Sequence, residues 1–180
     1  MLQVTIPASE YFDEKTGEFN SIRETTLQLE HSLVSVSKWE SKWCKPFLGP
    51  NEKTAEECID YVRCMTITQH VDPTVYQFLT QKNFQEINAY IEAPMTATTF
   101  SERENKRFSR EVVTAEIIYY WMVALNIPFE CQKWHLNKLI ALVRVCNIKN
   151  TPQKKMSRRE VTERNRALNE ARRKKMHSNG

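Results

Sequence analysis

Residues 27–47, LQLEHSLVSVSKWESKWCKPF, contain the point at which the pattern of the chain changes. Up to Leu29 apolar and polar residues alternate, which is typical of β-strands. From Ser32 onward the apolar residues recur every three or four positions, which is typical of an amphipathic helix. Ser32 can cap this helix, and Gly49-Pro50 should end it. The chain is therefore predicted to begin with strands and to continue with helices.

The N-terminal segment is predicted to form a small β element of two or three strands. Its apolar residues alternate in four short groups, namely Leu2, Val4 and Ile6, Tyr11 and Phe12, Phe19 and Ile22, and Leu27 and Leu29. Residues 13–17 separate the second group from the third, and Gly17 can adopt the positive φ that a hairpin loop of this length requires. We expect this β element to occupy residues 1–31 and to pack on the helical body.

Capping signals predict the helices that follow. Thr54-Ala55-Glu56-Glu57 is a capping box, and Asp72-Pro73 supplies an N-cap followed by proline. A later apolar helix is expected to begin at Ser101 or Ser109, and a last core helix covers residues 134–146. We expect residues 32–150 to form a helical domain, giving a mainly α fold of the α+β class. The residues expected to be buried together are Val113, Ile117, Tyr120, Trp121, Leu139, Ile140 and Val143.

The C-terminal arm, residues 151–180, is strongly basic. It contains ten Lys or Arg and three Glu, a net charge of +7, whereas residues 1–150 have a net charge of −3. Ser157-Arg158-Arg159-Glu160 is a capping box, so we expect a helix here, but only Val161 and Leu168 are good apolar residues. Such a helix cannot be held by burial and is either solvated or folds on a partner. An anionic partner is favoured.

Several functional classes are disfavoured by composition. The three glycines cannot form G-x-G-x-x-G or a P-loop, so nucleotide chemistry of those kinds is excluded. The longest apolar stretch, residues 117–125, is far shorter than the about 20 residues of a membrane-spanning helix. Five cysteines without a C-x-x-C pair, and no signal-peptide pattern at the start, favour reduced thiols in a cytoplasm.

Candidate chemical sites are incomplete. Cys131 and His135 have the i, i+4 spacing of two metal ligands, but a second pair is missing, so we expect no metal site. A cysteine activated by His70 or His135 has no local support. Glu116 lies in the most apolar helix and is interpreted as a boundary residue near Arg or Lys rather than as a catalytic acid or base. We expect no enzyme and no cofactor.

The tryptophans admit two interpretations. Core packing is favoured for them over a stacking platform or an interface, because three of the four have aliphatic neighbours at helical spacing. They are Trp39, Trp43, Trp121 and Trp134.

Nearly the whole chain resembles a group of structural-module proteins of tailed bacteriophages, most closely the tail-assembly chaperones. The similarity rests on the N-terminal hairpin, residues 39–43 (WESKW), 94–100 (PMTATTF), 121–130 (WMVALNIPFE) and 134–139 (WHLNKL), and on the basic end. The resemblance implies a non-enzymatic protein of the infected host cytoplasm. It implies that the protein binds the long helical tape-measure protein, or another tail-assembly protein, and leaves as the tail tube polymerises.

Residues 129–136 are the candidate docking surface for a helical client, because they contain two aromatic residues, Phe129 and Trp134. The arm is expected to contact an acidic client segment or a neighbouring copy. The alternative is a small nucleic-acid-binding accessory protein whose arm contacts phosphates. The arm residues named as candidate contacts are Arg158, Arg159, Arg164, Arg166, Arg172, Arg173, Lys174 and Lys175.

Overall fold

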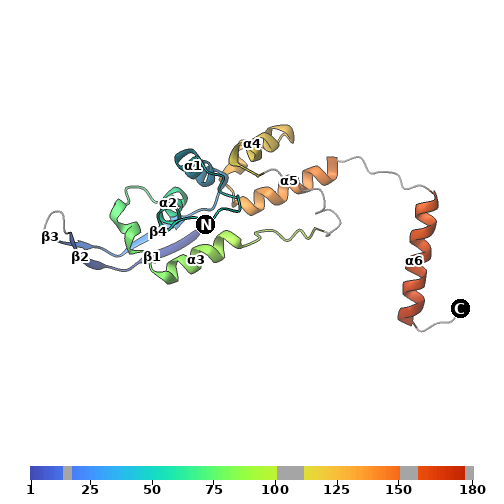
Figure 1. The fold of residues 1–180 in the computed structure, drawn as a ribbon, viewed down its shortest axis with the longest axis horizontal. Helices are drawn as coiled ribbons and strands as arrows, with labels where there is room; N and C mark the ends of the chain where they lie inside the picture. The colour runs from blue at the N-terminus through green and yellow to red at the C-terminus, as the bar shows by residue number, and fades with distance from the viewer. Residues whose placement is uncertain (14–17, 101–111, 151–157, 177–180) are drawn as a thin grey trace. The chain divides into compact units, whose positions relative to one another are not determined.

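A computed structural model of the chain describes residues 1–13, 18–100, 112–150 and 158–176 (Figure 1). Short antiparallel strand pairs at the N-terminus are followed by helices, which confirms the mainly α fold of the α+β class. The chain divides into two compact units, Met1–Asn147 and Ile148–Gly180. The first unit contains the strands and most of the helices, and the second contains the basic helix.

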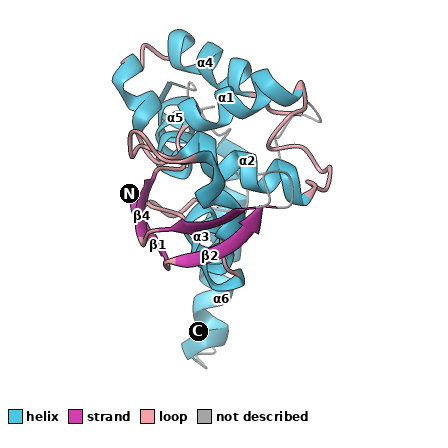
Figure 2. Cartoon of the chain, turned by 90° about the vertical axis from the view of Figure 1, so that its left-hand side faces the viewer, coloured by secondary structure: helices cyan, strands magenta, loops and turns pink. Residues whose placement is uncertain are grey.

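The β element has four strands in two pairs, not the two or three strands predicted. They are β1 (Leu2–Ile6), β2 (Ser9–Asp13), β3 (Glu18–Ile22) and β4 (Thr25–Leu29). β2 pairs with β3 (Figure 1), and β1 pairs with β4 (Figure 2), antiparallel in both cases. Each short apolar group forms its own strand because Pro7 and residues 23–24 interrupt the ladder. The expected hairpin loop falls mainly on residues 14–17, which are not described.

The capping signals for the next helices are confirmed. α1 (Leu33–Trp43) and α2 (Ala55–Met65) begin after Ser32 and Thr54, and each of these side chains accepts a hydrogen bond from the backbone N–H three residues on. Asp72 caps η1 (Pro73–Phe78), which is a 3₁₀ helix. A separate helix, α3 (Gln81–Glu92), then begins after Thr80.

The later helices are α4 (Ala115–Ala124), the 3₁₀ helix η3 (Phe129–Lys133), α5 (Leu136–Asn150) and α6 (Arg158–Met176). The starts expected at Ser101 and Ser109 lie outside the described residues.

The predicted core is partly wrong. Leu139 and Val143 are buried as expected, but Tyr120 is 68% exposed. Four others are only partly buried, namely Val113, Ile117, Trp121 and Ile140. The buried residues of α4 are instead Ala115, Ile118 and Met122. Because α4 is apolar around its whole circumference, its sequence does not indicate which side faces the core.

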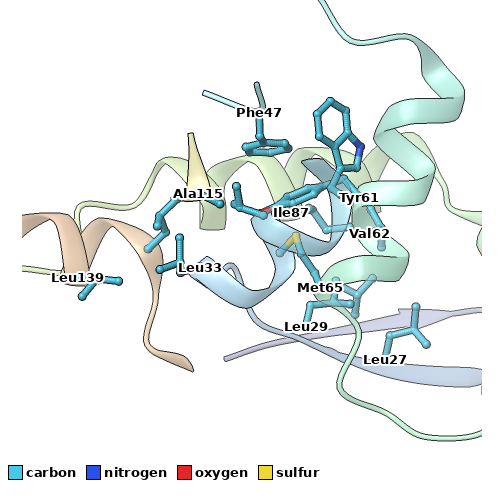
Figure 3. Close-up of a cluster of buried hydrophobic side chains, with 14 of the residues drawn as sticks. Leu27, Leu29, Leu33, Phe47, Tyr61, Val62, Met65, Ile87, Ala115 and Leu139 are labelled. Carbon is cyan, nitrogen blue, oxygen red and sulfur yellow. The ribbon is translucent and has the colours of Figure 1, made fainter. Parts of the chain in front are cut away.

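The strands and helices of the first unit share one core. Figure 3 shows Leu29 of β4, Leu33 of α1 and Met65 of α2 in one buried cluster that also includes Ile87 of α3 and Leu139 of α5. Trp39 is buried in this cluster, and its indole N–H donates to the carbonyl of Glu57 at 2.9 Å. The β element therefore packs on the helices, and the core positions α4 and η3 at the surface.

Candidate functional site

The outer side of α4 and the start of η3 form an exposed apolar surface. Its members, called the apolar face below, are Tyr119, Tyr120, Val123 and Phe129. Val123 is 59% exposed and Phe129 is 54% exposed. The rings of Tyr119 and Phe129 lie 6.4 Å apart, and the Tyr119 hydroxyl donates to Gln132 Oε1 at 2.9 Å. Tyr119 therefore joins α4 to η3 at this surface.

A buried carboxylate on α1 positions α4. Glu40 Oε2 accepts a hydrogen bond from the backbone N–H of Ala115 at 2.7 Å, and Oε1 accepts one from Phe47 at 2.7 Å. Thr114, the N-cap residue, makes no side-chain capping bond. The side chain of Glu40, on α1, therefore takes the role of the N-cap of α4. Sequence reasoning did not recognise this role of Glu40. A carboxylate at an apolar position of a helix was the available signal.

Glu116 is exposed in the first turn of α4. An acidic side chain there interacts favourably with the positive end of the helix dipole. The exposed position agrees with a boundary residue rather than with a buried acid or base, but Glu116 forms no ion pair with Arg or Lys among the described residues.

The connection after α4 fixes Phe129. Asn126 has φ 52°, in the left-handed region that Asn tolerates, and the Ile127 N–H donates to the carbonyl of Met122 at 2.8 Å. Ile127 is buried, and Pro128 precedes η3. Phe129 is therefore exposed next to an anchored turn.

Trp134 is exposed, as the docking prediction requires, but it stands apart from the apolar face. The ammonium of Lys138 lies 4.5 Å from the centre of its ring. Among the described residues no ring contact joins Trp134 to Phe129. Cys131, His135 and Leu136, in the same predicted segment, are buried. Residues 129–136 thus expose two separate aromatic side chains rather than one continuous surface.

His135 belongs to a buried hydrogen-bonded cluster. Its Nε2 lies 3.0 Å from the carbonyl oxygen of Tyr90, and its ring centre lies 5.1 Å from that of His31. His31 Nδ1 in turn lies 2.5 Å from the Tyr61 hydroxyl. Burial, and then the neighbouring His135, lower the pKa of His31 to about 3. Both rings are therefore neutral structural groups near pH 7.

The described residues contain no cluster of three or more side chains suited to a metal ion, and this includes the surroundings of Cys131 and His135. Cys58 and Cys64 are half-buried free thiols, and burial raises the pKa of both. A raised pKa keeps a thiol protonated and poorly nucleophilic at neutral pH. Cys58 and Cys64 therefore offer no support for nucleophilic catalysis.

The basic helix α6 exposes the side chains of every candidate arm residue named above. Within the helix, Arg159 pairs with Glu163 at 3.3 Å and Arg166 with Glu170 at 3.8 Å. Val161 and Leu168 are also exposed. The helix thus presents a dense positive surface that suits an anionic partner.

Every helix in the described parts of the chain is too short or too polar to cross a lipid bilayer. Comparisons of the chain with protein-family models, with curated proteins and with solved structures give no match. The geometry and the sequence resemblance are therefore the basis for a functional proposal.

Proposed function

We propose that this protein is a non-enzymatic tail-assembly chaperone that binds the tape-measure protein in the host cytoplasm during phage tail morphogenesis. The sequence resemblance supports this proposal, and so does the apolar face. The single observation on which it depends is the outer side of α4, where Tyr120 and Val123 are mostly exposed although the helix is apolar all round.

A helix that is apolar around its circumference is normally covered on all sides. Here Ala115, Ile118 and Met122 are buried, whereas Tyr120 and Val123 are mostly exposed. An amphipathic client helix could lie along the other side, with aromatic residues as anchors. A long helical protein with exposed apolar stripes tends to aggregate. The apolar face would cover such a stripe and so prevent aggregation.

Co-expression with the tape-measure protein tests the proposal. We expect a soluble complex that weakens when Tyr120→Ser and Phe129→Ser are combined, because both side chains belong to the apolar face. Trp134→Ser tests the second aromatic site separately. Phe19→Ser is the matched control, because Phe19 on β3 is 81% exposed and lies outside this surface.

A client that is equally soluble alone and never co-purifies with this protein would disprove the proposal. Equal weakening by Phe19→Ser and by the double variant would show that general surface hydrophobicity, rather than the apolar face, binds the client.

Nucleic-acid binding by α6 is the second candidate, favoured by eight exposed basic residues in one helix. If α6 neutralises phosphates of duplex DNA, the logarithm of the affinity should fall with the logarithm of salt concentration, with a slope of about −0.9 per phosphate. Deletion of residues 151–180 should then abolish binding. If the arm instead serves a protein client, DNA binding should be weak, independent of sequence and absent at physiological salt.

A further inference from the structure

A second surface of the first unit is hollowed between α1, the end of α2 and η1. The cavity has a volume of about 410 Å³, and its lining includes Lys38, Lys42, Arg63 and Tyr76. This volume falls within the range of about 300–1,000 Å³ that is usual for small-ligand sites. None of its lining residues belongs to the apolar face.

Positive charge dominates the lining. Asp60 is the single acidic residue among the lining residues, against Lys38, Lys42 and Arg63. Its two oxygens are occupied, since Oδ1 pairs with Lys42 at 2.5 Å and Oδ2 accepts from the Trp43 indole N–H at 2.9 Å. Among the described residues no carboxylate lies within 4.0 Å of the Lys38 or Arg63 cations. Two positive charges are thus available in a body whose residues 1–150 have net charge −3.

Tyr76 supplies an unused hydrogen-bond donor in the same cavity. It is only 6% exposed, and its hydroxyl has no hydrogen-bond partner among the described residues. The guanidinium of Arg63 lies 5.7 Å from the centre of its ring. Among the described residues no buried side-chain nitrogen or oxygen lacks a partner, so the Tyr76 hydroxyl faces the solvent in the cavity. An acceptor group of a ligand beside the two cations can take the place of that solvent.

The other lining residues favour a carboxylate over a phosphate. Val71 and Pro73 give the cavity an apolar part, against which the methylene groups of a Glu or Asp side chain can pack. No lining residue is a glycine, and the Gly-rich backbone loops that cradle phosphates are therefore missing here. We infer that this cavity binds an acidic segment of a protein partner, with its carboxylates between Lys38 and Arg63 and accepting a hydrogen bond from Tyr76.

Fluorescence anisotropy with labelled hexaglutamate and the full-length protein tests this inference. Lys38→Gln combined with Arg63→Gln should weaken binding about tenfold, because two charge-assisted contacts are lost. Tyr76→Phe should weaken it about threefold to fivefold, because it removes one donor and keeps the ring. The control that removes the same charge elsewhere, Lys82→Gln combined with Lys133→Gln, should change the affinity less than about twofold.

Carbodiimide cross-linking then locates the peptide, because it joins a bound carboxylate to a nearby lysine. Cross-links to Lys38 or Lys42 are expected. Cross-links confined to residues 158–175 would overturn the inference, because the arm would then bind the peptide. An equal loss of affinity in the control variant would also overturn it, because net charge would then explain binding. Inorganic phosphate that displaces the labelled peptide, when its concentration equals that of the peptide carboxylates, would also overturn the inference. The site would then select small oxyanions. These outcomes leave the client proposal untouched, since the two surfaces share no residue.

Discussion

Helices α1 and α6 show two different ways in which this chain forms a helix. α1 has 11 residues, five of them buried, and its outward charges Lys38 and Lys42 border the cavity. α6 has 19 residues, and every side chain described in it is exposed. Tertiary burial stabilises α1, whereas only local interactions such as i, i+4 ion pairs stabilise α6. The comparison teaches that the folded core and the charged arm should respond independently to mutation.

Helix α4 combines both situations. Its inner side is buried like the inner side of α1. Its outer side is exposed like α6, but apart from Glu116 in the first turn it carries apolar side chains in place of charged ones. This difference is the physical basis for the proposals that α4 binds a protein client and that α6 binds an anionic partner.

The largest expected effect is the difference in stability loss between truncating a core leucine and truncating a leucine of the arm. Leu139→Ala in α5 should lower the free energy of unfolding by about 3 to 5 kcal/mol, because the side chain is fully buried and leaves a cavity. Leu168→Ala in α6 should change it by less than about 0.5 kcal/mol, because that side chain is exposed. Urea unfolding measures both. Equal effects would show that the comparison between core and arm is wrong.

The next effect concerns pH. The pKa of His31 is 6.5 in the unfolded chain and about 3 in the folded chain. Between these pH values the unfolded state therefore binds more protons than the folded state. Stability should therefore fall by about 2 kcal/mol as the pH drops from 6.5 to 5. Burial lowers the pKa of His135 as well, which acts in the same direction.

Thermal or urea unfolding of the body at several pH values measures this loss. His31→Gln should reduce the slope between pH 6.5 and 5, whereas His70→Asn should leave it unchanged, because His70 is exposed. The carboxylates titrate below this window in the unfolded chain. If stability depends on pH as steeply in His31→Gln as in the unchanged protein, then His135 or another group, and not His31, causes the loss.

A smaller loss is expected at the contact that positions α4. Glu40→Gln should destabilise the body by about 1 to 2 kcal/mol, because an amide NH₂ group then faces one of the two buried N–H donors. The same variant should weaken client binding if α4 is the docking helix. Glu116→Gln, at an exposed position of α4, is the control, and a loss as large as that of Glu40→Gln would contradict the capping role.

The smallest expected effect is that of removing the arm. Deletion of residues 151–180 should leave the melting temperature of the body within about 2 °C, because none of the buried core residues lies in the arm. Client solubility should nevertheless decrease if the arm contacts an acidic client segment. A body that unfolds without the arm would show that α6 contributes to the fold.

Local signals in the sequence predicted the boundaries of several elements. Ser32, Thr54 and Asp72 cap their helices as expected, because a capping side chain bonds to backbone groups only two or three residues away. The arm was also predicted to form a basic helix that burial does not hold, either solvated or folding on a partner, because few apolar residues were available. The described side chains of α6 are exposed. Phe129 and Trp134 are exposed, as the docking hypothesis required, although core packing was the favoured interpretation for the tryptophans.

The tertiary structure alone decided what depends on distant partners. Which side of α4 faces the core, and hence the exposure of Tyr120, follows from packing against other helices and not from apolar spacing within α4. Glu40 caps a helix 75 residues further along the chain. The cavity likewise unites Lys38 with Tyr76 across three elements. Sequence therefore determined the helices and the charge of this protein, and long-range packing determined its surfaces, because a surface is formed by residues that only the folded core brings together.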